Sequence, residues 1–307
     1  MDRLRRGATV GAGFDAADGA MLLVTLIWAI NNVTSKIALA QFVPLAFVLA
    51  RLALATAAVF PVVALRGRLV LPARRDWPLV VLVGALGFAV YNALFILGLD
   101  RTSAFSVALL LSLGPVFTLL FASVLGIERI GPVQWAGVVV ALVGVAVFVS
   151  DKFVGQQAFS PAGDAIIVLA AACFAAYNLA SRPLVSRYGP DVASAWTLLA
   201  GFVVLVPICW NAAFAQDWAA IDPPAWAALA YAALFSLLLA YVLWTWAIER
   251  RGVGRTTPYL FLLPMLTGVF SAILTGERFG PGKVAGAVLI LAGTAVVRVL
   301  GARWARR

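Results

Sequence analysis

The chain has 307 residues, of which 64% are hydrophobic and only 12% are charged, with a net charge of +10 and no histidine. A soluble domain carries roughly 45–50% apolar and about 25% charged residues. The composition therefore excludes a soluble domain and indicates a helical membrane protein. The positive charge does not indicate nucleic-acid binding, because the basic residues lie in short connections between apolar runs, where they orient a protein in the bilayer.

Residues 1–17 are polar and contain three arginines, and we expect a cytoplasmic tail there. Apolar runs of about 20 residues, the length that crosses a bilayer as a helix, then recur to the end of the chain. We predict ten spans, at 18–40, 44–66, 76–99, 102–126, 131–150, 163–187, 190–214, 224–248, 252–275 and 280–299. The polar connection 151–162 separates the fifth span from the sixth, and residues 301–307 form a second basic tail.

The chain is a duplicated unit. A proline within an apolar run, a Glu-Arg pair and two glycines occur in both halves, and each residue lies 149 positions from its counterpart. The first copy contains Pro115, Glu128, Arg129, Gly137 and Gly144, and the second contains Pro264, Glu277, Arg278, Gly286 and Gly293. Nearer the front of each half, a spacing of 146 links Asn32 to Asn178, Lys36 to Arg182, Pro44 to Pro190 and Pro61 to Pro207. Self-similarity at a fixed period indicates a repeat architecture.

We therefore divide the chain into a first repeat, 18–150, and a second repeat, 163–300, each with five spans. Two repeats with an odd number of spans must lie upside down relative to each other, which is the plan of many secondary transporters. The expected fold is an all-α integral membrane protein with ten transmembrane helices, arranged as two inverted five-helix repeats around a central cavity.

The basic residues predict the orientation of the chain. Seventeen of the 23 lysines and arginines fall on the side that holds the two tails, five fall on the other side, and Arg51 lies within a span. Cytoplasmic connections are enriched in Lys and Arg, so we expect both termini in the cytoplasm and a multi-pass protein of the bacterial inner membrane.

The acidic residues argue against several kinds of chemistry. All thirteen carboxylates lie in tails, connections or span ends, so the interior relay that a proton-driven carrier usually keeps is missing. Cys173 and Cys209 fall inside apolar runs and are expected to be small core residues. We expect no catalytic residue, metal or cofactor, and no GxxxxGK[ST] motif for ATP is present.

Polar and aromatic side chains within the spans are the candidates for lining the cavity. Trp28, Asn32 and Lys36 share one face of the first span, and Asn178 repeats that face in the sixth. The full set is Trp28, Asn32, Lys36, Arg51, Tyr91, Asn92, Tyr177, Asn178, Tyr241, Trp244 and Tyr259. Amides bind polar ligands, and aromatic faces attract cations and flat apolar groups. The alternative is that such residues hold helices together, or that Lys36 extends to the interface.

Pro115 and Pro264 lie mid-span, where proline deletes a helical hydrogen bond and bends the helix. We interpret them as hinges of a gate, with a static bend as the alternative. The duplicated glycines are expected at close helix contacts. The Glu-Arg pairs Glu128-Arg129 and Glu277-Arg278 are expected to pair with neighbouring charges or backbone groups.

In these residues the chain resembles the EamA-type ten-helix group of the drug/metabolite transporter superfamily. The resemblance rests on Trp28, Lys36, Pro44 and Arg51 in the first two spans and on the duplicated Pro, Glu-Arg, Gly, Gly pattern. It implies two inverted five-helix repeats around a central cavity, working by alternating access, and the export of amino acids or other small metabolites. One branch exports aromatic amino acids. The second repeat departs from the first at Thr197, which stands where the first has Arg51.

The leading hypothesis is therefore an exporter of amino acids or similar small metabolites, with aromatic amino acids among the candidates, working by facilitated diffusion. A proton-coupled drug or metabolite antiporter is an alternative of the same class. A membrane-embedded lipid-processing enzyme is disfavoured because no nucleophile, base or metal cluster is found. A channel is a further alternative, and transport that saturates with substrate would argue against it. The expected partners are a small molecule and the lipid bilayer, and a monomer is compatible with the sequence.

Overall fold

A computed structural model describes residues 15–67, 69–126, 131–154, 160–251, 259–260 and 262–297. These residues form α-helices and no strand. The α-helices are α1 (Ala16–Ala38), α2 (Pro44–Leu65), α3 (Trp77–Gly84), α4 (Tyr91–Arg101), α5 (Ala104–Leu111), α6 (Gly114–Val124), α7 (Pro132–Val154), α8 (Pro161–Tyr188), α9 (Pro190–Ala215), α10 (Pro223–Tyr231), α11 (Ala240–Arg251), α13 (Leu262–Thr275) and α14 (Pro281–Ala295). A 3₁₀ turn, η1 (Arg74–Asp76), precedes α3, and two π-helical segments, η2 (Ala85–Val90) and η3 (Ala232–Leu239), precede α4 and α11.

Seven helical segments in the described residues are long and apolar enough to cross a membrane. Three further apolar helices are shorter: Pro132–Phe148, Leu262–Thr275 and Pro281–Ala295. The described chain is thus an all-helical membrane protein. The ten spans in two inverted repeats stay a prediction.

The helices begin where local chemistry favours a start. Proline occupies the first turn of α2, α8, α9, α10 and α14, where its missing N–H is not needed for an intrahelical bond. The first helix begins with a capping box, in which Asp15 accepts from the backbone of Asp18 and the Asp18 side chain accepts from the backbone of Asp15.

The observed helices differ from the predicted spans in three places. The first helix begins at Ala16, inside the predicted tail 1–17. Helix α7 continues to Val154 and α8 begins at Pro161, so the described residues of the predicted connection 151–162 are helical except for Ser160. The predicted span 102–126 is broken at residues 112–113, between α5 and α6.

That break corrects the interpretation of Pro115. Pro115 lies in the first turn of α6 and not in a helix interior. A proline in the first turn removes no intrahelical hydrogen bond, because the N–H groups there have no partner in the helix. Pro264 is the third described residue of α13, and Phe261, which precedes that helix, lies outside the described residues.

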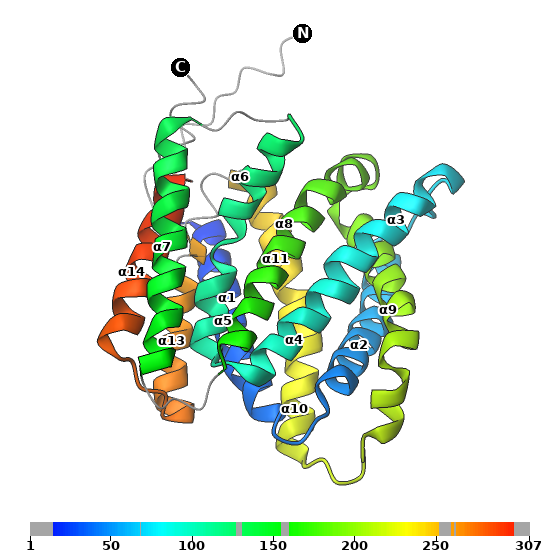
Figure 1. Cartoon of the computed structure of the whole chain (residues 1–307). Coiled ribbons are helices and arrows are strands. Elements are labelled where there is room, and N and C mark those ends of the chain that lie inside the picture. Colours follow the sequence, from blue (N-terminus) through cyan, green and yellow to red (C-terminus); the bar gives the residue numbers. More distant parts are fainter. Residues whose placement is uncertain are drawn as a thin grey trace.

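The packing pairs segments from the two halves (Figure 1). Helix α7 packs along α14, and α2 packs along α9. Helix α8 contacts α4 and α6, and α1 contacts their counterparts in the other half, α11 and α13. Each contact of α8 with a helix of the first half therefore has a matching contact of α1 with the corresponding helix of the second half. The α7–α14 and α2–α9 contacts each join two corresponding helices.

The duplicated glycines lie where α7 and α14 touch. A Cβ on Gly137 would lie 2.8 Å from the carbonyl oxygen of Gly293, and a Cβ on Gly286 would lie 2.6 Å from the backbone of Phe148. A Cβ on Gly144 would likewise meet the backbone of Ile290 at 2.6 Å. The prediction of close-packing glycines is confirmed.

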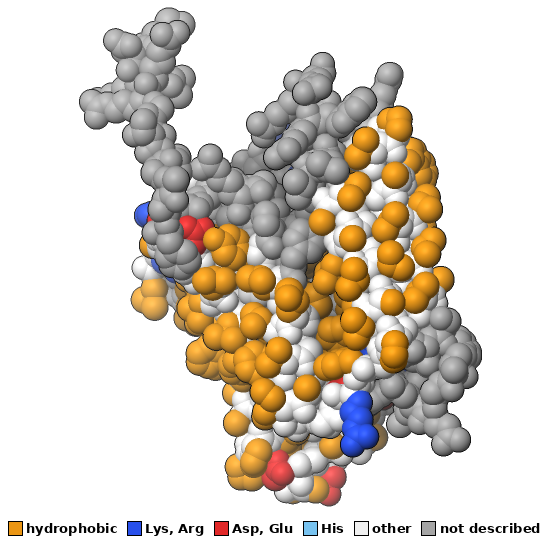
Figure 2. Space-filling view, turned by 90° about the vertical axis from the view of Figure 1, so that its left-hand side faces the viewer, with side chains coloured by type: hydrophobic (Ala, Val, Ile, Leu, Met, Phe, Trp, Pro, Cys, Tyr) orange, Lys and Arg blue, Asp and Glu red, His pale blue; other side chains and the backbone are white. Residues whose placement is uncertain are grey.

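The outer surface of this helix pair is apolar. Figure 2 shows hydrophobic side chains over most of the described part of this face, with the visible charged side chains toward its ends. Trp135 and Val139 on α7, and Val284 and Val288 on α14, are each more than half exposed. Such a face suits the hydrocarbon region of a bilayer.

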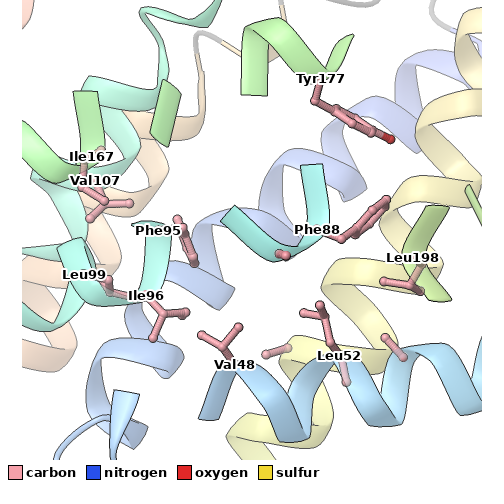
Figure 3. Close-up of a cluster of buried hydrophobic side chains, with 14 of the residues drawn as sticks. Val48, Leu52, Phe88, Phe95, Ile96, Leu99, Val107, Ile167, Tyr177 and Leu198 are labelled. Atoms are coloured by element: carbon pink, nitrogen blue, oxygen red, sulfur yellow. The ribbon is translucent and has the colours of Figure 1, made fainter. Parts of the chain in front are cut away.

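A hydrophobic core lies between α2, α4, α8 and α9. In Figure 3, Phe88, Phe95 and Ile96 lie between Val48 and Leu52 of α2 and the ring of Tyr177 on α8. This core surrounds the polar residues described next.

Candidate functional site

The two π-helical segments lie just before Tyr91 and Tyr241, which are 150 positions apart in the chain. The first, η2, ends at Val90, next to Tyr91, and the second, η3, ends at Leu239, two residues before Tyr241. The widened turns offer carbonyls to side chains: Asn92 Nδ2 donates to Gly87 O at 3.2 Å, and Trp28 Nε1 donates to Ser236 O at 3.1 Å. Single π turns occur frequently at functional sites.

Four predicted site residues, Trp28, Arg51, Tyr91 and Tyr241, are linked by ring or electrostatic contacts, and buried Asn92 follows Tyr91 directly. We call these five residues the central cluster. They come from α1, α2, α4 and α11. The ring of Trp28 lies 6.1 Å from that of Tyr241, centroid to centroid, and 5.7 Å from that of Trp244. Both tyrosines interact electrostatically with Arg51. The cluster combines one cation, one amide and aromatic rings.

Arg51 is the most unusual member of the central cluster. Only 4% of it is exposed, and its Nε and Nη1 atoms have no hydrogen-bond partner among the residues that the structure describes. Its guanidinium carbon lies 5.7 Å from the centroid of the Phe95 ring. Buried polar groups are nearly always hydrogen-bonded, so this exception needs an explanation.

A row of aromatic rings extends the cluster from α4 to α8. Tyr91 lies 4.9 Å from Phe174, and Phe174 lies 5.8 Å from Tyr177. Tyr177 in turn packs edge-on against Phe88 at 5.7 Å. Tyr177, a predicted site residue, thus joins the wall of the cluster through ring contacts.

A cavity leads toward the central cluster. Its empty volume is about 570 Å³ including its open mouth, and it lies between α2, α9, η3 and α11. One end is lined by Arg66 and Asp191, which pair at 3.3 Å, and Tyr241 lines the cavity as well. We call this side, where α2 ends and α9 begins, the first side of the molecule.

The second side, where α1 ends and α2 begins, is held by polar contacts. Lys36 Nζ donates to the carbonyls of Leu99 and Asp100 at the end of α4, at 2.8 and 2.7 Å. Gln41 donates to Asp222 at the start of α10, at 2.6 Å, and this hydrogen bond lowers the pKa of the Asp222 carboxyl. These bonds tie the end of α1 and the chain just after it to α4 and α10.

A charged network on α13 and α14 also lies on the second side. Lys283 Nζ pairs with Glu277 Oε1 at 2.5 Å, and Ser271 donates to the other oxygen of Glu277. The rings of Phe105 and Phe279, 4.8 Å apart, lie close to the Lys283 ammonium. The prediction that Glu277 pairs with a neighbouring charge is confirmed, and Glu128-Arg129 lies outside the described residues.

The remaining predicted site residues lie around the cluster or away from it. Asn32 is buried, and its Nδ2 donates to Thr267 Oγ1 at 3.5 Å. Trp244 packs against Trp28, whereas Tyr259 donates to Asp18. Asn178 is exposed on α8. Lys36, as described above, is bound at the end of α4.

Three buried carboxylates among the described residues were missed as candidates. Asp76, 4% exposed just before α3, pairs with Arg187 and accepts a hydrogen bond from Tyr188 at 2.5 Å. The other two are Asp18 and Asp164. Asp18 and Asp164 are 4% and 1% exposed, in the first turns of α1 and α8. Tyr259 donates to Asp18, and Thr102 Oγ1 donates to Asp164 at 2.5 Å. The two aspartates are 146 positions apart, so the spacing that links Asn32 to Asn178 would have found them.

The comparisons with known proteins agree with one another. A model of the EamA-like transporter family matches residues 16–150 and, separately, 161–299. The chain is 31% identical over 234 residues to the "Probable terminal-alkyne amino-acid exporter" of Streptantibioticus cattleyicolor, covering 76% of this chain and 77% of that protein. It is 26% identical over 298 residues to the "Probable amino-acid metabolite efflux pump" of Escherichia coli, covering 94% and 96%. A crystal structure of a protein with 20% identity shares the fold, with a TM-score of 0.64 over 94% of this chain and 98% of that one.

Proposed function

This chain belongs to the EamA-like transporter family, whose members are transporters and not enzymes, and from that premise we propose that it exports amino acids or similar small metabolites. The proposed mechanism is alternating access through the central cluster. Two of its relatives carry amino-acid export or efflux in their names, which supports the substrate class. The aromatic rings of the cluster make aromatic amino acids candidate substrates.

The observation that carries the proposal is the cavity. It extends from Arg66 and Asp191 on the first side to Tyr241, and Tyr241 belongs to a buried cluster of polar and aromatic groups. Ligand sites are typically apolar pockets with a few convergent polar groups, as here. The second side is tied together by Lys36 and by the Lys283–Glu277 pair. This arrangement fits a carrier loaded from the first side.

We propose that the ten helical segments form two inverted five-helix repeats, with both termini and the first side in the cytoplasm of a bacterial cell. The exchange of helix contacts between halves supports the repeats, and the distribution of Lys and Arg supports the orientation. Helix α6 begins at Gly114, directly after the break at 112–113, and we place one hinge there, beside Pro115. We place its counterpart at Pro264.

We propose that transport is facilitated, because no carboxylate belongs to the central cluster. Among the described residues, the buried carboxylates are those of Asp18, Asp76, Asp164 and Glu277. Each lies in or directly before the first turn of a helix, or just beyond the last turn. A proton-coupled antiporter would need one of them to take part.

The test is uptake of radiolabelled amino acids into proteoliposomes, with and without a pH gradient. We expect saturable uptake without the gradient, strongest for large neutral or aromatic amino acids. Uptake only with the gradient would contradict the facilitated mechanism and direct attention to the buried carboxylates of Asp18, Asp76, Asp164 and Glu277. Uptake of none of the twenty amino acids would contradict the substrate class.

Two matched substitutions separate the cluster from the lipid-facing surface. Tyr241→Ala removes a ring that lines the cavity, and Trp135→Ala removes a ring that is 51% exposed on α7. We expect Tyr241→Ala to reduce uptake at least about tenfold, because burial of a large apolar side chain contributes about 1.5–3 kcal/mol. Trp135→Ala should retain uptake. Equal uptake by the two variants would place the binding site elsewhere.

A further inference from the structure

The buried charge of Arg51 lacks the partner that the other fully buried cation has. Among the described residues, Lys283 is 1% exposed and is paired with Glu277. Arg51 is 4% exposed, and two of its nitrogens have no acceptor in the described part of the chain. Arginine stays protonated in proteins, so the charge cannot be avoided by losing the proton. Keeping such a charge unpaired in the interior costs stability.

The surroundings of Arg51 supply rings in place of an anion. Phe95 lies under the guanidinium, and Tyr91 and Tyr241 are the groups that interact with it electrostatically. Tyrosines in their neutral form do not balance a full charge. A carboxylate would, because the planar guanidinium fork matches its two oxygens, and charge-assisted bonds are about twice as strong as neutral ones.

Asn92 has an unused acceptor on α4, the helix that carries Tyr91 and Phe95. It is 1% exposed, and its Oδ1 has no hydrogen-bond partner among the described residues, while its Nδ2 is bound to Gly87 O. It follows Tyr91 directly and lies three residues before Phe95, about one helical turn. An acceptor of this kind suits an ammonium group.

The second repeat shows that the fold does not require a cation at this position. Thr197, 146 positions after Arg51, is buried and donates to the backbone of its own helix at Ala193 O, at 2.7 Å. The corresponding position on α9 therefore holds a small side chain whose hydroxyl is hydrogen-bonded within its own helix. Packing at this position therefore does not by itself explain the charge of Arg51.

We propose that Arg51 binds the carboxylate of the transported molecule and that Asn92 Oδ1 accepts from its ammonium group. The inference rests on the proposed function and narrows it: the substrate is a zwitterion with a free carboxylate, and amines without one are not substrates. The side chain of the substrate lies against the rings of Trp28, Tyr91 and Tyr241. It arrives through the cavity that Tyr241 lines.

The experiment measures ligand-induced thermal shifts of the purified full-length protein. The probes are the twenty amino acids, together with L-phenylalanine's two truncated analogues, 3-phenylpropanoate and 2-phenylethylamine. The variants are Arg51→Met, Arg51→Lys and, as a matched control, Arg250→Met. Arg250 is exposed and lies over the ring of Trp246, so its loss removes a cation outside the cluster.

For the wild type we expect shifts with one or more amino acids and none with 2-phenylethylamine. Arg51→Met should weaken binding of the shifting amino acids by about 10- to 100-fold, and Arg51→Lys, which keeps the charge and loses the fork, by less. Arg250→Met should bind as the wild type does.

Three results would overturn the inference. They are equal binding by the wild type and Arg51→Met, a shift with 2-phenylethylamine at least as large as with L-phenylalanine, and the absence of any shift with a carboxylate-bearing probe. Binding that depends on Arg51, without uptake into proteoliposomes, would instead contradict the proposed function and leave the carboxylate site standing.

Discussion

Lys283 and Arg51 are both cations buried next to phenylalanine rings, but only one of them has an anionic partner in the described part of the chain. Lys283 on α14 pairs with Glu277, which also accepts from Ser271. Arg51 on α2 faces Tyr91, Tyr241 and Phe95, and two of its nitrogens are unpartnered among the described residues. In one region the buried cation is ion-paired within the chain, and in the other it has no anionic partner among the described residues.

The difference supports the proposal that one region is a permanent contact and the other a binding site. A buried pair whose groups are all bonded is costly to break, so it holds α13 and α14 together on the second side. A buried charge with unused donors is costly to keep, which supports the proposal that Arg51 binds the carboxylate of a substrate. The glycines strengthen the contrast, because α7 and α14 approach closely whereas α2 and α11 border a cavity.

The largest effect on stability is expected from Lys283→Met. The substitution leaves the Glu277 carboxylate buried without its cation, and removing one partner of a buried pair costs about 3–5 kcal/mol. The measurement is the thermal unfolding temperature in detergent, which should fall markedly. The double variant Lys283→Met with Glu277→Gln removes both charges and should recover most of the loss. A double variant no more stable than the single one would show that the pair is not the cause.

A smaller loss is expected from Gly293→Ala. The added Cβ would lie 2.4 Å from the amide nitrogen of Ala141 and 2.6 Å from Gly137 O, so α7 and α14 would have to move apart. Overpacking of this kind costs about 1–3 kcal/mol. Gly114→Ala is the matched control, because a Cβ there meets nothing within 4 Å. Equal unfolding temperatures for the two variants would mean that the α7–α14 contact adjusts freely.

Arg51→Met should leave stability unchanged or raise it, in contrast to Lys283→Met. Methionine fills a similar volume without a charge that lacks partners, and replacing buried charged groups by apolar ones is often neutral or stabilising by about 1–4 kcal/mol. The check is the unfolding temperature without ligand, beside the uptake assay, in which activity should be lost. A fall as large as that of Lys283→Met would mean that Arg51 has a structural partner after all, and the contrast between the regions would disappear.

Much of the fold could be predicted because apolar runs, helix-starting prolines and regularly spaced glycines are signals that can be read from the sequence alone. Pro44 and Pro190 begin the helices that the sequence analysis places there. The duplicated glycines indicated close helix contacts, and the structure shows that these contacts join α7 and α14. The break at 112–113 was missed because the apolar run continues through it. The two π-helical segments carry no proline or other marker of an extra residue per turn, so the sequence does not indicate them.

The candidate site was predicted in part, because the type of a residue and its position within a span can also be read from the sequence. Residue type and depth in a span selected Arg51, Tyr91 and Tyr241, which the structure brings together. Asn178, selected as the counterpart of Asn32, is exposed, whereas Asn32 is 4% exposed, and the spacing of the repeats does not reveal this difference. That Arg51 has unpartnered donors follows only from the three-dimensional surroundings.

The smallest effect is expected from Trp28→Phe, which tests whether the η3 segment is part of the central cluster. Phenylalanine keeps a ring beside Tyr241 and Trp244 but removes the indole N–H that donates to Ser236 O at 3.1 Å. Loss of one neutral hydrogen bond at a buried carbonyl costs about 1 kcal/mol. Because Ser236 lies five residues before Tyr241, the loosened turn should also raise the KM for uptake about two- to fivefold with little change in the maximal rate. The control is Trp135→Phe on the exposed face of α7, which should change neither quantity. If both variants behave alike, the indole bond does not position Tyr241, and the cluster then depends on ring packing and on Arg51 alone.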